Sequence, residues 1–269
     1  MKTVFITGAS SGIGKETAKL FQKKGWNVIA TMRSPQSENE LTKLGNVKVV
    51  QCDVTDRESI KNAISEGVAA FKRIDVLVNN AGYYVLGPLE AATYEQIGRQ
   101  IDTNLLGVIA VTKEMVPHFR RQKSGVIINL SSIAGVISIP LQSLYHATKW
   151  GVEGFSEALQ YELRPLNIRV KIIEPGIIKT DFLGRSMTTL YDETLTEYEA
   201  YSQKVIKNIH ENGNKGSTPD VVAETIYKAA TSNNKRLRYS TGKMKELVLM
   251  HRMLPYRLFA ALMQSVMEK

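Results

Sequence analysis

The stretch Thr3-Val4-Phe5-Ile6-Thr7-Gly8-Ala9-Ser10-Ser11-Gly12-Ile13-Gly14, residues 3 to 14, decides the fold class of this chain. The apolar run at residues 3–6 predicts a buried strand, and helical periodicity begins at about residue 12. Glycines between the two allow a tight turn and a close approach to a pyrophosphate, which the free N–H groups of a helix start attract. A glycine-rich connection without a ligand is the alternative, because the spacing Gly-x-x-x-Gly-x-Gly differs from the usual dinucleotide fingerprint.

Short apolar runs alternate with longer amphipathic segments along the rest of the chain. The runs show no strict alternation with polar residues, as expected for strands buried on both faces of a parallel sheet. The predicted strands are residues 4–7, 28–31, 47–51, 76–79, 126–130, 170–173 and 237–240. The predicted helices are residues 12–24, 57–72, 94–121 and 143–164. This pattern predicts one α/β domain over residues 1–269, a Rossmann-type, doubly wound parallel sheet of about seven strands flanked by helices.

Composition favours a globular protein of the cytoplasm. Hydrophobic residues make up 43% of the chain and charged residues 23%, which is ordinary for such a protein. Cys52 is the single cysteine, so the sequence predicts neither a disulfide framework nor a metal site. No apolar stretch reaches the ~20 residues that span a bilayer. Because the first predicted strand follows the initiator at once, we expect no signal peptide and a cytoplasmic location.

The basic excess lies largely at the C-terminal end. Residues 235–269 carry eight Lys or Arg against two Glu, which is +6 of the total net charge of +9. Nucleic-acid binding is not predicted, because no recognisable motif or interleaved aromatics accompany these charges. Residues 244–269 form a predicted helical extension, rich in Met and Leu and broken at Pro255, that could rest on an anionic membrane or close a lid. Packing on its own domain or against another subunit is the alternative that we favour.

Tyr145 and Lys149 lie near the start of the predicted helix 143–164, for which Ser143 is the predicted N-cap. Residues four apart share a helix face. A phenol with a pKa near ~10 becomes a useful acid or base at neutral pH only if its anion is stabilised, and an ammonium group one turn away supplies that stabilisation. A solvated surface pair is the alternative interpretation.

The segment after the second predicted strand lacks the acid that binds the adenosine ribose in many dinucleotide sites. Arg33 occupies that place, and the next carboxylate is Glu38. A guanidinium can pair with a 2′-phosphate and the Ser10 hydroxyl adds a donor, so these residues favour NADP over NAD. A solvated surface arginine is the alternative. Asp53, at the end of the third strand, could accept a hydrogen bond from adenine or simply precede a helix.

Five motifs together resemble the short-chain dehydrogenases/reductases along about residues 3–180. They are Thr7-Gly8-x-x-x-Gly12-x-Gly14, Asn79-Asn80-Ala81-Gly82, Ser132, Tyr145-x-x-x-Lys149 and Pro175-Gly176, in that order. The interval of 13 residues from Ser132 to Tyr145 is part of this resemblance. Residues 28–33 and 253–259 look most similar to the 17β-hydroxysteroid, retinol and acyl-dihydroxyacetone-phosphate reductase-like branch.

The resemblance implies roles for individual residues. It implies that Tyr145 is the general acid/base, that Ser132 positions and polarises the substrate oxygen, and that Lys149 lowers the tyrosine pKa and holds the nicotinamide ribose. Asn104 is implied to order a water molecule in the proton relay. The segment at residues 175–180 is implied to grip the carboxamide. The cofactor-binding residues predicted in total are Gly8, Ser10, Ser11, Gly12, Ile13, Gly14, Arg33, Asp53, Val54, Asn80, Ala81, Gly82, Tyr145, Lys149, Pro175, Gly176, Ile178 and Thr180.

The predicted activity is NADP(H)-dependent hydride transfer between nicotinamide and a carbonyl or secondary alcohol of a small hydrophobic substrate. An NAD-dependent alcohol or steroid dehydrogenase and a non-catalytic dinucleotide-binding sensor are the alternatives. The resemblance also implies homo-oligomers that assemble through the helices at 94–121 and 143–164.

A substrate lid is expected at residues 181–217, with Tyr83 and Tyr84 on the opposite wall. The lid contains several large apolar side chains that could cover the substrate. For Leu195, Tyr198 and Tyr201 the alternative is the buried stripe of a helix.

Overall fold

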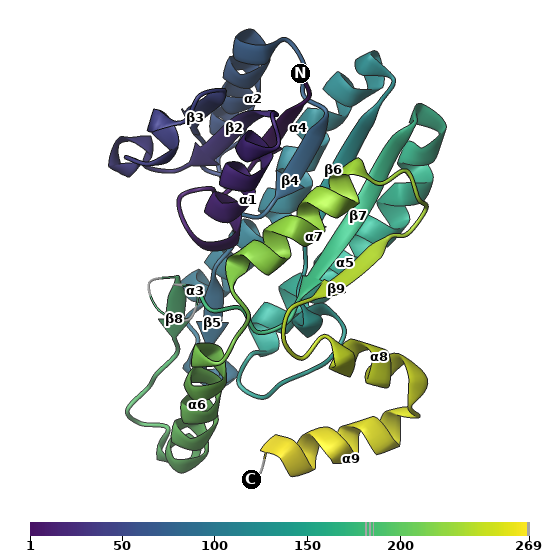
Figure 1. Ribbon diagram of the computed structural model, residues 1–269. Coiled ribbons are helices and arrows are strands. Elements are labelled where there is room, and N and C mark those ends of the chain that lie inside the picture. Colours follow the sequence, from purple (N-terminus) through teal and green to yellow (C-terminus); the bar gives the residue numbers. More distant parts are fainter. Residues whose placement is uncertain (181, 183, 185, 268–269) are drawn as a thin grey trace.

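Seven parallel strands form the central sheet of the computed structural model (Figure 1). In spatial order they are β3 (Val47–Gln51), β2 (Asn27–Met32), β1 (Thr3–Ile6), β4 (Val76–Asn79), β6 (Gly125–Leu130), β7 (Ile168–Pro175) and β9 (Arg238–Thr241). The structure describes residues 1–267 apart from 181, 183 and 185. All seven predicted strands are confirmed, and each end lies within two residues of its predicted place.

Helices cover both faces of the sheet. α1 (Gly12–Lys23) and α7 (Pro219–Thr231) cover one face, whereas α2 (Arg57–Phe71), α4 (Gly107–Gln122) and α5 (Ser143–Leu163) cover the other. Side chains of one strand alternate between the two cores: Val4 and Ile6 pack under α1, and Phe5 packs on the opposite side. Burial on both faces is the reason that inner strands such as β1, β4 and β6 are almost continuously apolar, whereas the edge strands β3 and β9 are only partly buried.

The strand order reverses beside β1. The chain passes from β1 through β2 to β3 on one side, and then crosses to β4, β6, β7 and β9 on the other. At such a reversal a crevice opens at the carboxyl ends of the strands, where open α/β sheets bind ligands. The glycine loop after β1 and residues 80–82 after β4 both lie at this crevice.

The helix predicted over residues 94–121 is divided in the structure. α3 (Tyr94–Ile101) and α4 are joined by a π-helical turn, Asp102–Leu106, which contains Asn104. The side chain of Asn104 accepts a hydrogen bond from the Tyr83 N–H at 3.0 Å and donates one to the Tyr83 carbonyl at 2.8 Å. This tether fastens the wide turn to the loop after β4, a contact that helical periodicity does not reveal.

The predicted helix over residues 143–164 is confirmed, but its start differs by one residue. α5 begins at Ser143, so Gln142 is the N-cap and the prediction of Ser143 is wrong. The backbone carbonyl of Gln142 accepts from the His146 N–H, and no side chain caps this end. Helix boundaries defined by backbone bonds commonly differ by a residue from those suggested by capping side chains.

The crevice is also surrounded by elements that the sequence analysis does not predict. β5 (Tyr84–Leu86) and β8 (Met187–Thr189) form a separate parallel pair, and α6 (Glu199–Asn214) follows them. Three-residue strands are too short to show a period. Short 3₁₀ turns occur at Pro35–Ser37, Leu41–Lys43, Leu89–Ala91, Ile133–Gly135, Arg164–Leu166 and Thr196–Tyr198.

The C-terminal extension consists of two helices, as the sequence predicts. α8 (Glu246–Met253) and α9 (Tyr256–Met267) are divided at Pro255. In Figure 1, α6, α8 and α9 lie together at the end of the molecule where the strands have their carboxyl ends. No helix in the described part of the chain is long and apolar enough to cross a bilayer.

Candidate active site

The glycine loop is held against the end of β4 by close backbone contacts. Gly8 has a φ of +66°, and a Cβ atom there would lie 2.8 Å from the Cα of Ala81. A Cβ at Gly14 would lie 2.5 Å from Nδ2 of Asn80. Side-chain atoms would therefore separate the loop from the strand, and glycine is the residue that both positions require.

The start of α1 faces the crevice without a side-chain cap. Ser11 is the N-cap but its hydroxyl accepts no bond from the helix, so the first N–H groups are left for another partner. Ser10, Ser11, Gly12 and Ile13 line the crevice, and Gly14 lies behind them against Gly8. A row of unpaired N–H groups at a helix start matches the donor set that a diphosphate needs.

The segment after β2 carries one exposed cation and one neutralised acid. Arg33 is exposed on the crevice wall and makes no ion pair with any residue that the structure describes. Glu38 is 6% exposed, accepts the N–H groups of Glu40 and Leu41, and pairs with Lys15 at 3.1 Å. These partners hold the pKa of Glu38 low against the effect of its burial. Because its carboxylate is already satisfied, Glu38 does not offset the positive charge of Arg33 at this end of the crevice.

The ends of β3 and β4 complete this half of the crevice. Asp53 and Val54 line it, and one carboxylate oxygen of Asp53 accepts both the N–H and the hydroxyl of Thr55. The N-cap of α2 is Asp56, so Asp53 does not begin that helix. Asn80 donates to the carbonyl oxygens of Thr7 at 2.9 Å and Gly8 at 3.0 Å, which locks the glycine loop to β4.

Tyr145 and Lys149 are both buried on the inner face of α5, at the other end of the crevice. Nζ of Lys149 donates to the Leu130 carbonyl at 2.8 Å and lies 5.6 Å from the centre of the Tyr145 ring. The solvated-pair interpretation is therefore wrong. Burial raises the pKa of Tyr145 to about 12, an effect that the neighbouring Ser132 side chain opposes. Burial lowers the pKa of Lys149 to about 8, and the negative charge of Glu153 opposes that shift.

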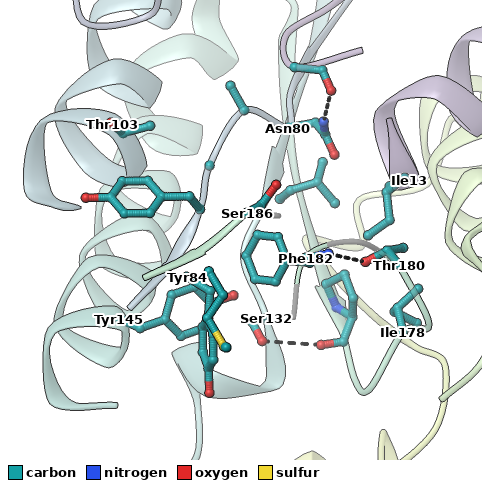
Figure 2. Close-up of a pocket in the computed structure, with 18 of the residues that line it drawn as sticks. Ile13, Asn80, Tyr84, Thr103, Ser132, Tyr145, Ile178, Thr180, Phe182 and Ser186 are labelled. Carbon is teal, nitrogen blue, oxygen red and sulfur yellow. Dashed lines mark hydrogen bonds between the residues drawn. The ribbon is translucent and has the colours of Figure 1, made fainter. Parts of the chain in front are cut away.

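Ser132 follows β6 and reaches toward Tyr145, as Figure 2 shows. Its hydroxyl accepts from the Ala134 N–H at 3.1 Å and donates to the Pro175 carbonyl at 3.4 Å. The second contact is long, so the hydroxyl can exchange it for a closer acceptor. Ser132, Tyr145 and the segment at Pro175 therefore meet around one small volume.

The segment after β7 closes the crevice opposite α5. Pro175, Gly176, Ile178 and Thr180 all line it. The Gly176 N–H is bound to the Thr241 carbonyl at 2.8 Å, and Ile178 pairs with Ser217. Figure 2 shows Ile178 and Thr180 facing the crevice beside Ile13.

These walls enclose one continuous cavity of about 820 Å³. One part is polar and is lined by the glycine loop and the strand ends, as described above. The other part is apolar, and its wall includes the side chains of Tyr84, Ile139, Phe182, Met187, Val205 and Ile209. The ring of Tyr84 lies 4.9 Å from that of Tyr145 in an edge-to-face arrangement (Figure 2). The polar part suits the phosphates of a dinucleotide, and the adjoining apolar part suits a hydrophobic compound beside it.

The structure brings the predicted site residues together with two exceptions. Gly14 and Asn104 do not line the cavity: Gly14 packs behind the loop, and Asn104 is 1% exposed and bound to Tyr83. The other predicted residues line the cavity, from Gly8 in the glycine loop to Thr180 after β7. Tyr83 and Tyr84 lie on its wall as expected.

Only part of the predicted lid, residues 181–217, lines the cavity. Met187 lines the cavity, but Tyr198 and Tyr201 are exposed, so the interpretation of these two as part of a buried stripe is wrong. Residues 181, 183 and 185 of the predicted lid (181–217), and residues 268–269 of the predicted extension (244–269), lie outside the described residues. The α6 residues on the wall are Val205, Asn208, Ile209 and Asn212, which sequence analysis missed. Their spacing of three and four residues is typical of one helix face, and this was the signal by which the sequence could have shown that they lie together.

The chain is similar to known proteins over most of its length. The family model for short chain dehydrogenase matches residues 2–190. The 3-ketodihydrosphingosine reductase of Bacteroides thetaiotaomicron is 37% identical over 246 residues, which cover 91% of this chain and 89% of that protein.

Solved structures are similar as well. A short-chain dehydrogenase from Streptomyces avermitilis is similar with a TM-score of 0.85 and 28% identity, over 99% of this chain and 98% of that one. The structure of ElxO with NADP bound has a TM-score of 0.72 and 33% identity, over 89% and 97% of the two chains. Other similar structures contain NADH or NAD.

Proposed function

The chain belongs to the short-chain dehydrogenase family, and from that premise we propose that it is an NADP(H)-dependent reductase of hydrophobic carbonyl compounds. The observation that carries the proposal is the position of Tyr145, which is buried between Lys149 and an apolar wall at the end of a dinucleotide-sized cavity. Membership of the family and the cavity support a nicotinamide dinucleotide as cofactor. The choice of NADP, the substrate class and the roles of individual residues are the proposal itself.

The uncapped start of α1 would hold the diphosphate through Ser11, Gly12 and Ile13. Arg33 would pair with a 2′-phosphate, supported by the Ser10 hydroxyl. Asp53 keeps one carboxylate oxygen for the adenine, and the segment from Pro175 to Thr180 would hold the carboxamide. Bound in this way, NADPH supplies the hydride for the reaction.

Proton transfer is the part of the reaction that the chain itself performs. With a pKa of about 12, Tyr145 is protonated at neutral pH and can give its proton to the substrate oxygen. The Ser132 hydroxyl donates a hydrogen bond to that oxygen as negative charge develops on it. The Lys149 ammonium, charged below its pKa of about 8, stabilises the phenolate that remains. The side chain of Asn104 is bound to the Tyr83 backbone behind the cavity wall, so the proposed water molecule of the proton relay would lie at the π-helical turn rather than on this amide.

The apolar part of the cavity supports a hydrophobic substrate. Its wall offers aromatic and aliphatic side chains from β5, β8 and α6, interspersed with the polar side chains of Thr188, Asn208 and Asn212. A relative named for reduction of a long-chain ketone, 3-ketodihydrosphingosine, supports the same class. Long-chain or polycyclic ketones are therefore the proposed substrates.

Substitution of the acid/base provides the first test. The assay monitors NADPH oxidation by its absorbance in the presence of hydrophobic ketones, aldehydes or quinones. The rate of oxidation should fall at least about 100-fold in Tyr145→Phe. Binding of NADPH should survive, because the change removes one oxygen atom. The matched control is Tyr191→Phe, an exposed tyrosine outside the cavity wall, which should keep full activity.

Two results would reject parts of this proposal. Full turnover in Tyr145→Phe would remove the proton-transfer mechanism. Tight NADPH binding with no turnover of any carbonyl in the wild type would identify a dinucleotide sensor instead.

Cofactor preference provides the second test. Arg33→Leu should weaken NADPH binding by about tenfold or more, the effect of losing a charge-assisted hydrogen bond, and should leave NADH binding nearly unchanged. Titration calorimetry with both cofactors measures the difference. Arg57→Leu, an exposed arginine outside the cavity, is the control. Equal weakening of NADPH and NADH would remove the case for recognition of the 2′-phosphate and favour the NAD-dependent alternative.

A homo-oligomer formed through α4 and α5 is also part of the proposal. Trp150 and Tyr161 on α5 are 50% and 66% exposed, and Leu106, just before α4, is 48% exposed. Large apolar side chains at such exposure on neighbouring helices support a subunit contact. Light scattering of the purified protein would measure the assembly.

A further inference from the structure

The C-terminal helices α8 and α9 carry a second, unexplained apolar face. We name this set of exposed side chains the outer face, and it consists of Leu249, Met253, Leu254, Tyr256, Leu258 and Leu262. Met253 and Tyr256 are 73% and 77% exposed, which is unusual for side chains of this size. Six large exposed apolar residues within one segment of 14 residues are more than the single scattered ones that need no explanation.

The packing of these helices on the domain does not account for the outer face. Val248, Phe259 and Met263 point inward and form a buried cluster with Ile133 and Ile137. A helix that only covers its own domain needs this inner stripe and a polar face toward solvent. The inner and outer stripes of α9 each have members four residues apart, at 259 and 263 and at 258 and 262. Consecutive positions lie about 100° apart around a helix, so the apolar surface of α9 extends beyond its buried stripe onto the solvent side.

The charges around the outer face are mainly positive, although Glu246 at the start of α8 is an exposed acid beside it. Residues 247–267 contain no Asp or Glu. Lys243, Lys245 and Arg257 are exposed and pair with no acid in the described part of the chain. Arg252 is different, because it donates to Glu174 at 2.9 Å and is held against the domain. An apolar face with a cationic border complements a surface that is apolar inside and anionic outside.

The outer face lies at the end of the molecule where the cavity is found. α8 and α9 share that end with α6 in Figure 1, and Met244, just before α8, lines the cavity. Neither helix is long enough to cross a bilayer, so any contact with lipid is with its surface.

We propose that the outer face of α8 and α9 docks this protein on the surface of an anionic lipid bilayer. The leucine and methionine side chains enter the boundary between headgroups and acyl chains, Tyr256 lies at the headgroup level, and the exposed cations pair with lipid phosphates. A second copy of the chain is the less suitable occupant. A two-fold contact through the same face would place Lys245 and Arg257 of both copies together, where like charges repel. The inference does not depend on the proposed activity.

Co-sedimentation of the full-length protein with vesicles tests the proposal. Binding is expected with vesicles of phosphatidylcholine and phosphatidylglycerol, should be weaker at high salt, and should be much weaker with phosphatidylcholine alone. The double variant Leu258→Ser and Leu262→Ser should lower the bound fraction by about tenfold. The charge variant Lys245→Glu and Arg257→Glu should remove the preference for anionic lipid.

The matched controls substitute exposed apolar and cationic residues at other places on the surface. Tyr94→Ser removes an exposed aromatic side chain at the start of α3, and the pair Lys48→Glu and Arg57→Glu reverses two exposed cations far from α8. Both should bind vesicles as the wild type does, and unchanged melting temperatures would show that each variant is folded. The proposal is overturned if the wild type stays in the supernatant with anionic vesicles. It is equally overturned if the leucine double variant binds as well as the wild type, or if the outer face proves to be covered by a second copy in solution.

Discussion

At the scale of single residues, the proposed proton transfer depends on charges that surround Lys149 deep in the domain. Glu153 lies one turn further along α5, is 6% exposed, and accepts from Nε of Arg238 at 2.9 Å. Arg238 also binds Glu157 and lies 3.7 Å from Glu174, which precedes Pro175. This network joins the helix that carries Tyr145 to the strand that ends at Pro175. Glu153 is therefore a positioning residue, because it acts through Lys149 and Arg238 and lies outside the cavity wall.

The charge of Glu153 should set the alkaline limit of carbonyl reduction. Burial lowers the pKa of Lys149 to about 8, and the Glu153 carboxylate opposes that shift by favouring the ammonium form. Glu153→Gln removes the opposing charge, so the pKa of Lys149 falls further and the lysine loses its proton at lower pH. The falling limb of kcat/KM against pH should therefore move to lower pH, with little change in the acidic range.

The pH profile is measured with one hydrophobic ketone and NADPH. Glu157→Gln is the control, since Glu157 also binds Arg238 but is half exposed on the outer side of α5. A limb that stays in place, or that moves to higher pH, in Glu153→Gln would contradict this electrostatic role.

Sequence could predict some of these residues and not others. Tyr145 and Lys149 are four apart on one helix, so local spacing alone places them on one face. Ser132 and Asn104 were found through the family resemblance, and the structure places Ser132 on the cavity wall and Asn104 behind it. The contact between Glu153 and Arg238 joins residues 85 positions apart, and nothing in either local sequence marks it.

At the scale of elements, the glycine loop and the start of α1 form one unit with the end of β4. Asn80 donates to the loop carbonyls, and Gly14 leaves the space that this amide occupies. The position thus needs glycine for packing, although it has no direct part in the cavity wall. Its spacing from Gly8 was visible in the sequence, but the reason for it was not.

Gly14→Ala should disrupt this unit. The new methyl group would lie 2.5 Å from Nδ2 of Asn80 and would also meet the Gly8 carbonyl, so the loop must move from β4. Overpacking of this kind costs about 1–3 kcal/mol of unfolding free energy. Because the displaced loop carries the N–H groups proposed for the diphosphate, NADPH binding should weaken at least about tenfold.

Urea unfolding and cofactor titration measure the two effects. The control is Gly154→Ala on α5, where a Cβ meets nothing within 4 Å and alanine should stabilise the helix by up to about 1 kcal/mol. Wild-type stability and NADPH affinity in Gly14→Ala would show that the loop tolerates a side chain and would contradict the packing argument.

The elements that sequence predicted well are the long and regular ones. The inner strands of the central sheet, such as β1, β4 and β6, are buried on both faces, so their composition marks them. The π-helical turn at Asp102–Leu106 was missed because five residues within a longer helical segment are too few to show a period of their own. β5 and β8 depend on each other for their hydrogen bonds and lie about 100 residues apart, so neither is recognisable alone.

At the scale of the whole molecule, the C-terminal end of the chain supports the loop that carries Ser132. Val248, Phe259 and Met263 cover Ile133 and Ile137, which follow Ser132 directly. Arg252 makes a second link by binding Glu174, beside the segment after β7. Sequence predicted two helices divided at Pro255 and favoured packing on the domain, which the inner stripe confirms. It could not predict the loop that they cover, because amphipathic periodicity says which side is apolar and not what that side meets.

Substitutions at two neighbouring residues of α9 distinguish the role of its buried side in stability from the role of the outer face. Phe259 is 4% exposed within the inner cluster, whereas Leu258 is 60% exposed on the outer face. Phe259→Ala should lower the unfolding free energy by about 3 kcal/mol, since it leaves a cavity beneath the catalytic loop. Leu258→Ala should change that free energy by less than about 0.5 kcal/mol. Urea unfolding followed by tryptophan fluorescence measures both, with Trp26 and Trp150 as the natural probes.

Activity measurements should follow the same division between the two residues. A loosened cluster lets Ile133 and Ile137 move, and with them Ser132, so Phe259→Ala should lower kcat/KM for carbonyl reduction while NADPH affinity stays close to that of the wild type. Leu258→Ala should leave kcat/KM with soluble ketones unchanged, because its side chain contacts neither the loop nor the cavity. If both variants had the same unfolding midpoint and the same kcat/KM, α9 would not support the active site. The C-terminal helices would then serve the outer face alone.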